Sequence, residues 1–435
     1  MGVVSCGTTM LDQGVFQNIG AVTWDTTAKT SGFTAVSGNG YFCNTTSSAF
    51  TVTLPAGSAG DIFALADYAA TWQTNAVTVT PNGTDKIGGT NADVVLSTEG
   101  QSVTFIYTDS TQGWLNVIDS TSNARAETFI TATGGTITTS GNYKIHKFTG
   151  PGTFAVSATS ACSANNIVSY MVVGGGGGGG ASGAGGGGGG AGGFREYKGP
   201  ADCYSASPLN GNPGGTAITV TATPYPITVG GGGSAGTFGG GYPGAPFTAA
   251  TSGANSVFST ITSTGGGFGA GDPAPRNGTA GGSGGGGANT GGTGGAGNTP
   301  PVSPSQGFPG GNGGPNTGGT GSGGGGGSTQ AGTNIAGGTP AKGGNGATTS
   351  ITASPTAYGG GGGGGSHTGD DFGAGGTGGG GDAYSPGAPP TPTPSTAGTA
   401  NTGGGGGAGT ARGSTFMGDG AAGGSGIVVI RYKYQ

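Results

Sequence analysis

Short runs in which apolar and polar residues alternate dominate the first 125 residues. A period of two places every second side chain on one face of an extended strand, which is the pattern of a half-buried β-strand. Turn-forming pairs such as Asn82-Gly83 separate the runs. Residues 61–72 (DIFALADYAATW) fit less well and could form a strand followed by a helical turn or a loop. We predict strands at residues 49–57, 76–81, 102–109 and 113–119.

A second group of strand-like runs follows, and it is continued at the very end of the chain. Strands are predicted at residues 142–148, 152–157 and 166–173, and the last ten residues, GIVVIRYKYQ, form another such run. The apolar strands 166–173 and 426–435 therefore bracket the region between them. Parallel or antiparallel pairing of these two strands would close that region.

The bracketed region is built largely of glycine. Of the 114 glycines, 19 precede Gly174 and 95 follow in the last 262 residues. The glycine content of this region approaches that of collagen. No strict Gly-X-Y period is present, so a collagen triple helix is excluded. Uninterrupted runs stand at residues 174–180, 185–190, 230–233, 265–267, 284–287, 323–327, 359–365, 378–381 and 403–407.

Two structures compete for this region. A Gly/Ser linker is favoured by entropy, because ordering the backbone costs about 1–2 kcal/mol per residue and glycine has the most freedom to lose. Polyglycine II helices packed side by side would offset this cost, because without Cβ atoms their amides and carbonyls can bond to several neighbours. The recurring runs, the varied segments between them and the apolar brackets favour the packed domain.

The predicted fold is mainly β with almost no α-helix. An N-terminal β-sandwich or fibre-type module precedes a domain of packed polyglycine II helices that β-strands bracket. The predicted divisions are a stem or oligomerisation domain at 1–125, a connector at 126–173, the polyglycine II domain at 174–426 and a closing strand at 427–435.

Several stretches resemble the tail-fibre-like virion proteins of marine bacteriophages. In the first module these are SGFTAVSGNGYFCNTTSSAFTVTLPAG and LSTEGQSVTFIYTDSTQGW. In the second, FITATGGTITTSGNYKIHKFTGPGTFAVS, SYMVVGGGGGGG, YPITVGGGG and GGSGIVVIRYKYQ look like the glycine-rich, adhesin-type domain of such proteins. The likeness runs from about Gly32 to the end and is most specific at the framework segments 143–148, 150–154, 170–173, 227–229 and 427–432.

The resemblance implies a non-enzymatic virion protein, a tail fibre or adhesin subunit whose loops contact the bacterial surface. It further implies a homotrimer formed through the N-terminal β-domain, other tail or capsid proteins as partners, and a surface glycan or outer-membrane protein as receptor. One alternative is a head fibre or capsid decoration without receptor binding. A third is a cell-surface or extracellular filament protein.

Composition argues against several other classes. Only 7% of residues are charged and the formal net charge is −5, so no basic stripe for nucleic acid is expected. No apolar run reaches the length of a membrane helix, and MGVVSCGTTM lacks the features of a signal peptide. We expect a virion protein that becomes extracellular on host lysis. Cys6, Cys43, Cys162 and Cys203 form no zinc pattern and read as buried or incidental thiols, with a disulfide as the alternative.

Motifs for catalysis and cofactors are weak. The G-x-S-x-G matches at 232–236 and 281–285 have no following helix, and the chain holds only His146 and His367 as partners. His146 is expected at the surface of its strand. His367 with Asp370 and Asp371 could bind a metal ion but reads as a solvated polar loop. We therefore expect no enzyme activity, no cofactor and no metal.

Aromatic and charged residues between the glycine runs are the candidates for recognition. Exposed aromatic side chains are typical of binding hot spots and of surfaces that pack on sugar rings. Packing over the glycine helices as loop anchors is the alternative at each position. The binding candidates are Arg195, Tyr197, Tyr204, Tyr242, Phe308, His367, Phe372 and Tyr384, with Phe194 opening the first exposed loop.

Overall fold

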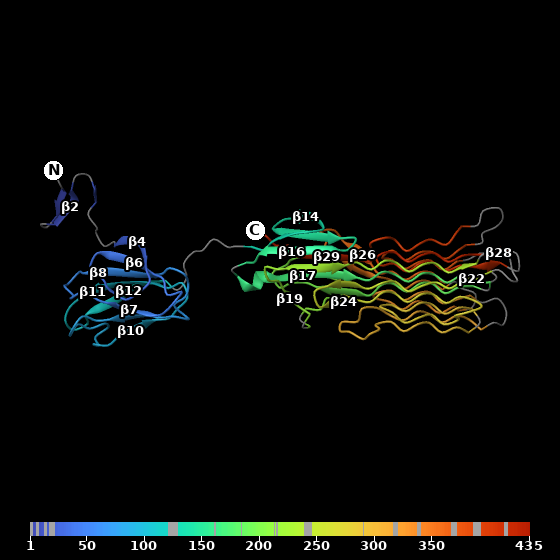
Figure 1. The fold of residues 1–435 in the computed structure, drawn as a ribbon, viewed down its shortest axis with the longest axis horizontal. Helices are drawn as coiled ribbons and strands as arrows, with labels where there is room; N and C mark the ends of the chain where they lie inside the picture. Colours follow the sequence, from blue (N-terminus) through green and yellow to red (C-terminus); the bar gives the residue numbers. More distant parts are fainter. Residues whose placement is uncertain are drawn as a thin grey trace. The chain divides into compact units, whose positions relative to one another are not determined.

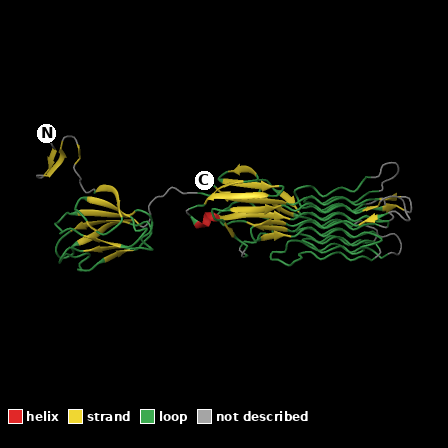
Figure 2. Cartoon of the chain, viewed as in Figure 1, coloured by secondary structure: helices red, strands yellow, loops and turns green. Residues whose placement is uncertain are grey.

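The computed structural model shows a mainly β chain in two compact units, residues 1–126 and 127–435 (Figures 1 and 2). Its one described helix is a 3-10 turn, Ser163–Asn166. The residues it describes are 3–5, 8–12, 15–16, 22–120, 129–160, 162–183, 185–212, 214, 216–238, 246–289, 291–315, 321–336, 341–366, 372–385, 393–412 and 416–435.

Two mixed sheets form the N-terminal unit. The larger has the order β12-β11-β8-β6-β4 and the smaller β10-β9-β7-β5, and a short sheet β1-β2-β3 precedes them. The larger sheet comprises β4 (Thr23–Lys29), β6 (Asn39–Cys43), β8 (Ile62–Asp67), β11 (Ser102–Tyr107) and β12 (Trp114–Ser120). The others are β5 (Phe33–Thr34), β7 (Phe50–Thr53), β9 (Val77–Thr80), β10 (Val94–Leu96), β1 (Val3–Ser5), β2 (Thr8–Asp12) and β3 (Val15–Phe16).

Alternating side chains of the two large sheets meet in one apolar core. Trp72, Trp114 and Phe63 are fully buried there. The four strands predicted for this module are confirmed. The ambiguous stretch 61–72 forms β8 followed by a non-helical turn, because the buried Asp67 carboxylate accepts the amides of residues 69, 71 and 72.

The C-terminal unit begins as a sandwich of two antiparallel sheets. One has the order β14-β15-β29-β17-β18 with β19 beside β17, and the other β13-β16-β20-β23-β24. The first holds β14 (Thr136–Ser140), β15 (Tyr143–Phe148), β17 (Ile167–Val173), β18 (Phe194–Tyr197), β19 (Ile218–Thr219) and β29 (Ile427–Lys433). The second holds β13 (Thr131–Thr133), β16 (Gly152–Ala158), β20 (Pro224–Thr228), β23 (Ser256–Phe258) and β24 (Ile261–Ser263).

The two strands that bracket the glycine region pair directly. β17 and β29 are antiparallel neighbours, with Val173 opposite Ile427. The pairing holds the entry and exit of the glycine region side by side, which confirms the predicted closure. One face of this sheet packs on Phe154 and Phe258 of the second sheet. The other face packs on the hairpin of β25 (Ala347–Thr349) and β26 (Thr356–Tyr358).

The glycine runs form a bundle in which hydrogen bonds repeat every three residues. In residues 174–180, every third amide from Gly174 donates to residues 187–193, at N···O distances of 2.8–3.0 Å. The amides one position later donate to residues 251–254, and those two positions later to residues 421–424. Three residues is the repeat of a polyproline II helix, which has no internal hydrogen bonds and turns its amides to three sides.

Each such helix is also an acceptor for further neighbours. The carbonyls of residues 174–180 accept amides from residues 233–236, 266–269 and 406–409, so six segments surround this run. A Cβ built at any position of the run would lie 1.8–2.4 Å from a neighbouring carbonyl oxygen. Cα hydrogens therefore point at carbonyls, which adds weak Cα–H···O contacts. The region is a packed polyglycine II bundle, and the linker interpretation is wrong.

Three described cysteines are free thiols. Cys43 is fully buried, and burial followed by the nearby Asp67 carboxylate raises its pKa to about 12. Cys162 and Cys203 are exposed. Cys6 lies outside the described residues. The thiol interpretation is confirmed for these three positions.

His146 is fully buried between the two sheets of the C-terminal unit, so its placement at the strand surface was wrong. Nδ1 lies 2.8 Å from the Gly134 carbonyl and Nε2 lies 3.0 Å from the Tyr432 hydroxyl. A carbonyl can only accept, so a neutral ring with the proton on Nδ1 satisfies both contacts. Burial is the largest cause that lowers the pKa of His146 from its ordinary value.

We expect the C-terminal unit to lose stability as the pH falls below about 6.5, the ordinary pKa of histidine. Because the folded-state pKa of His146 is lowered, the unfolded chain takes up the proton first. The stabilisation is complete above pH 6.5 and declines on acidification by at most about 1.4 kcal/mol per pH unit. Thermal unfolding between pH 7.5 and 5.5 measures it. The His146→Asn variant should show a shallower pH dependence, and equal slopes would contradict the assignment.

Candidate recognition surface

The glycine bundle has two chemically different ends. At the sheet end it joins β17, β18 and β29, and the opposite, far end includes the described turns at residues 181–183 and 272–277 (Figure 1). Two small hairpins mark the far end: β21 (Thr237–Phe238) with β22 (Phe247–Thr248), and β27 (Ala411–Arg412) with β28 (Phe416–Met417). The bundle thus presents a cluster of connecting loops on a rigid support.

The bases of the far-end loops are tied to one another. Ser182 forms isolated bridges to both Asp272 and Gly418, which joins three loops. The rings of Phe238 and Phe247 lie 5.3 Å apart across their hairpin, and the Phe238 amide donates to the Asp419 carboxylate at 2.7 Å. These contacts connect the described bases of the loops at this end.

Two of the recognition candidates lie at the far end. Phe372 is 40% exposed and starts a return crossing, since the next amide, that of Gly373, donates to Gly364. Tyr384 is half-buried, and its amide donates to Ala408, three residues before β27. Tyr242 and His367 with Asp370 and Asp371 lie outside the described residues.

The other described candidates lie at the sheet end. Phe308 is 36% exposed there, two residues after Gln306, whose carbonyl accepts the Phe194 amide. It is therefore exposed but not among the far-end loops.

The first segment after the double glycine run is a strand and not the expected exposed loop. Phe194, Arg195 and Tyr197 belong to β18, which pairs with β17, and all three side chains are buried. Tyr204 is also buried, against the same sheet. The recognition candidates Arg195, Tyr197 and Tyr204, together with Phe194, were therefore wrongly expected at the surface. The segment is buried because it pairs with the edge of an apolar strand beside the bundle.

Two buried carboxylates hold this segment in place. Glu196 accepts hydrogen bonds from the Tyr204 hydroxyl, the Ser207 amide and the Thr349 hydroxyl. Burial first, and then the charge of Glu196, raise the pKa of Tyr204. The carboxylate therefore joins the strand β18, the loop after it and the hairpin β25–β26.

The second carboxylate is Asp202, which pairs with Arg431 of β29. Arg431 Nε lies 3.0 Å from one Asp202 oxygen, and both side chains are 4% exposed. The guanidinium also stacks over the rings of Tyr143 and Tyr204, at 4.6 and 5.4 Å. The sequence contained no signal for this pair, since 229 positions separate its members.

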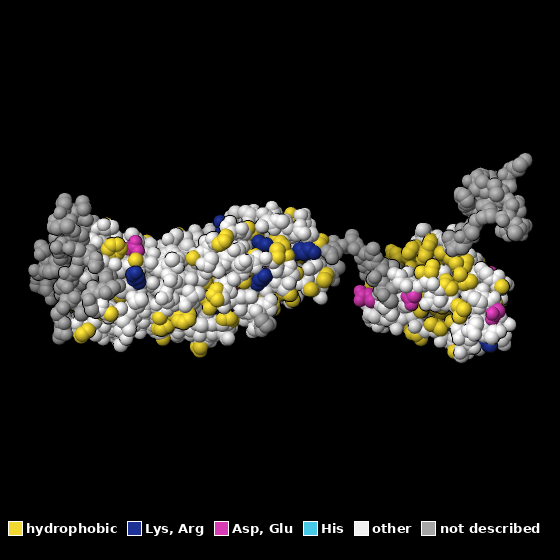
Figure 3. Space-filling model, turned by 180° about the vertical axis from the view of Figure 1, so that it is seen from behind, with side chains coloured by type: hydrophobic (Ala, Val, Ile, Leu, Met, Phe, Trp, Pro, Cys, Tyr) yellow, Lys and Arg dark blue, Asp and Glu magenta, His cyan; other side chains and the backbone are white. Residues whose placement is uncertain are grey.

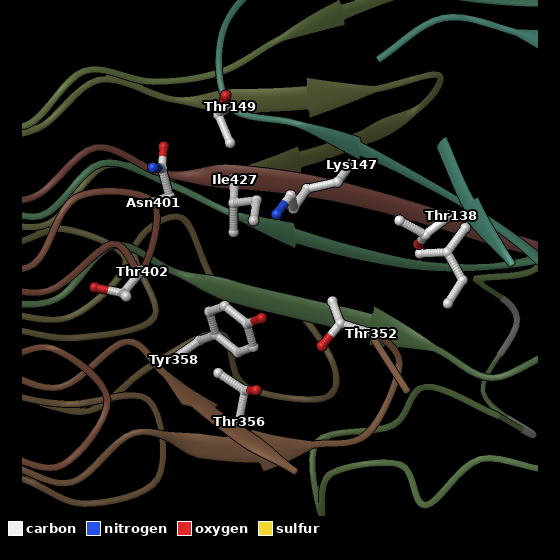
Figure 4. A pocket seen from close by; sticks show the side chains of 10 residues that line it. Thr138, Lys147, Thr149, Thr352, Thr356, Tyr358, Asn401, Thr402 and Ile427 are labelled. Carbon is white, nitrogen blue, oxygen red and sulfur yellow. The ribbon is translucent and has the colours of Figure 1, made fainter. Parts of the chain in front are cut away.

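A hollow of about 400 Å³ opens at the sheet end, beside the hairpin β25–β26. Ile145 and Ile427 line it together with threonines and Asn401. Figure 4 shows Lys147 from the sheet and Tyr358 from the hairpin on opposite sides of this space. Hydroxyl groups and one ammonium beside two isoleucine side chains suit a small hydroxylated or anionic group.

Evidence for a metal site or a membrane crossing is absent from the described part of the chain. Within it no group of three or more His, Cys, Asp or Glu side chains could hold a metal ion. Nor does any helix there have the length and hydropathy that a crossing requires.

Comparison with known families assigns the C-terminal unit to a protein family. A bundle of glycine helices closed by paired apolar strands defines a glycine-rich β domain. Residues 149–433 match the glycine-rich domain family, and the chain belongs to that family. The match begins in the turn between β15 and β16 and ends at the last residue of β29. No curated protein matches the chain.

Proposed function

We propose that the protein is a non-enzymatic virion component, a tail fibre or adhesin subunit that recognises the bacterial surface through loops at the far end of the polyglycine II bundle. The observation that carries the proposal is the bundle itself. Six-neighbour packing produces a stiff rod, and its far end carries connecting loops whose bases are interlinked. A rigid scaffold with variable loops is a common arrangement for recognition, because loops tolerate sequence change while the scaffold holds their positions.

The proposal includes the partners that the sequence suggested. The N-terminal unit mediates homotrimerisation and attachment to other tail or capsid proteins, and the receptor is a bacterial surface glycan or outer-membrane protein. An aromatic side chain such as Phe372 suits either receptor, because exposed rings pack on sugar faces and on apolar protein surfaces.

Competition with phage adsorption tests this function. Purified full-length protein should reduce adsorption of the parent phage to its host cells. Phe372→Ser at the far end should weaken this competition at least about tenfold, as expected for a hot-spot aromatic residue. Phe308→Ser, a comparably exposed phenylalanine at the sheet end, is the matched control and should compete like the unmodified protein.

Absence of competition at saturating protein would refute receptor binding. Immunogold labelling would then decide between the alternatives. Label on the capsid would favour a head fibre or decoration, and label on cell-surface filaments would favour a filament protein.

A further inference from the structure

The hollow beside the hairpin β25–β26 has one wall from a sheet and one from that hairpin. Ile145 and Lys147 are two residues apart in β15, so their side chains stand on the same face of the sheet. Thr138 of the edge strand β14 is the register partner of Ile145 and lines the hollow beside it. Tyr358 of β26 lines the opposite wall (Figure 4). Both walls are anchored in one apolar cluster, because Ile145 and Tyr358 belong to it, so the hollow is preformed.

Lys147 brings an unpaired ammonium group to the sheet wall. Its side chain is exposed, and it forms neither an ion pair nor a hydrogen bond among the residues that the structure describes. Arg431 on the neighbouring strand β29 differs, because its guanidinium pairs with Asp202. In Figure 4 the amino end of Lys147 points from the sheet into the hollow. A ligand in the hollow can therefore reach this cation.

The Tyr358 hydroxyl faces the same space from the hairpin. The residue is 5% exposed, and its hydroxyl makes no hydrogen bond within the described part of the chain. The unsatisfied side-chain atoms that are closed off from solvent there do not include this hydroxyl, so it is open to the hollow that it lines. By contrast, the hydroxyls of Tyr170, Tyr204 and Tyr432 all contact protein partners. An accessible phenol without a protein partner, on a ring that is otherwise buried, is available to a ligand.

Thr352 and two isoleucines add the remaining chemistry of the lining. The Thr352 hydroxyl also has no hydrogen bond among the described residues, and Figure 4 shows it on the Tyr358 side of the space. Ile145 and Ile427 provide apolar surface in the same lining. A hydroxyl group can both donate and accept, so Tyr358 and Thr352 suit the hydroxyls of a sugar. The apolar surface suits the C–H face of a sugar ring.

Charge selects an acidic ligand. None of the residues that line the hollow is acidic, and Lys147 is the one cation among them. The two buried carboxylates associated with this sheet are engaged elsewhere, Asp202 with Arg431 and Glu196 with three hydrogen-bond donors. Figure 3 shows several Lys and Arg side chains, with no acidic side chain among them, at the sheet end of the C-terminal unit. An anionic group in the hollow would thus meet an uncompensated positive charge.

We propose that this hollow binds a pyranose sugar that carries a carboxylate group. The carboxylate pairs with the Lys147 ammonium, ring hydroxyls contact Tyr358 and Thr352, and the C–H face of the ring packs on the isoleucines. The volume of about 400 Å³ lies in the range of small-molecule sites, about 300–1,000 Å³. This site is at the opposite end of the bundle from the far-end loops, and neither site depends on the other.

Isoleucine methyl NMR tests the proposal on the full-length protein. Ile427→Val identifies the methyl resonance of Ile427 in the lining, and Ile227→Val identifies that of Ile227 on the second sheet, outside the lining. The protein is titrated with the methyl glycosides of glucuronate, galacturonate and mannuronate up to about 50 mM, which is enough for millimolar dissociation constants. At least one of them should shift the Ile427 resonance saturably and leave that of Ile227 unchanged. The matching neutral methyl glycoside should bind at least about tenfold more weakly, because it lacks the charge-assisted contact.

Four variants connect the binding to the hollow. Lys147→Met, which removes the charge and keeps an apolar side chain, should weaken binding at least about tenfold, and Lys147→Arg should retain it. Lys144→Met is the matched control in the same strand, because the Lys144 ammonium lies over the Tyr434 ring and outside the lining. Tyr358→Phe removes only a hydroxyl without a protein partner, so the fold should be retained while binding weakens about threefold or more.

Four results would overturn the proposal. The first is the absence of a saturable Ile427 shift with any of the three acidic sugars. The second is equal affinity for an acidic sugar and its neutral counterpart. The third is a loss of affinity in Lys144→Met as large as that in Lys147→Met, which would indicate unspecific attraction. The fourth is equal affinity for sodium acetate, which would show an anion site that does not recognise the sugar. None of these readouts depends on adsorption to cells, so this test and the adsorption test can fail independently.

Discussion

Gly362→Ala should destabilise the C-terminal unit by about 3 kcal/mol and lower its thermal unfolding midpoint by roughly 5–10 °C. The added Cβ would lie 2.0 Å from the Gly406 carbonyl oxygen, and both partners are backbone, so neither can turn aside. Relief requires separating two helices that share hydrogen bonds with several others. Differential scanning calorimetry and amide exchange of the glycine runs measure the effect.

Gly231→Ala is the matched control within another run of the same bundle. No atom lies within 4 Å of a Cβ built at Gly231, and its backbone is not in the left-handed region. The unfolded chain loses freedom on this change, so stability should remain equal or rise by about 0.4–1 kcal/mol. Equal destabilisation by both variants would contradict the close-packed arrangement. Rapid amide exchange throughout the runs of the unmodified protein would contradict it as well.

Arg431→Met should lower the free energy of unfolding of the C-terminal unit by about 3–5 kcal/mol. This is the second variant for which we expect a large effect. The change leaves the Asp202 carboxylate buried at 4% exposure without the cation that lies 3.0 Å away. Two neutral hydrogen bonds remain to it, from the Ser169 hydroxyl and the Cys203 amide, each at 2.8 Å. Breaking one side of a buried pair is more costly than removing both, because the remaining charge stays desolvated. Equilibrium unfolding in guanidinium chloride gives the free-energy change.

The double variant Arg431→Met with Asp202→Asn should recover part of the loss, which distinguishes an uncompensated charge from lost packing. Arg276→Met is the surface control. Arg276 pairs with Asp272 at 3.6 Å but is 56% exposed, so the change should cost at most about 1 kcal/mol. If Arg276→Met lowered the free energy of unfolding as much as Arg431→Met, burial of the ion pair would not be the cause of the large effect.

The elements with a strong local pattern were predictable. Strands β7, β9, β11, β12, β15, β16, β17 and β29 lie where alternation and turn residues placed them. The pairing of β17 with β29 followed from two apolar runs that each needed a partner. Local periodicity suffices here because a strand buries a face only if its own residues alternate or are continuously apolar.

The candidate site was predictable in part only. Phe372 was expected in an exposed loop and is exposed at the far end, whereas Arg195, Tyr197 and Tyr204 are buried at the opposite end. What separates them is whether a strand edge lies beside the segment, which depends on a sheet whose strands extend to Lys433. His146 was misplaced for the same reason, since its burial depends on the Phe154 ring of the second sheet and on Tyr432, which lies 286 positions away.

By itself the sequence determined that this chain is mainly β, that the glycine region is closed by two apolar strands, and that its runs are long enough to pack as polyglycine II helices. Glycine is informative in this way because only a residue without Cβ permits contact between backbones. The tertiary structure alone decided which runs are neighbours, which loops lie at the far end and which charged side chains are buried. Glycine helices have no side chains to specify partners, so their arrangement follows from the connecting loops and the sheet that anchors them.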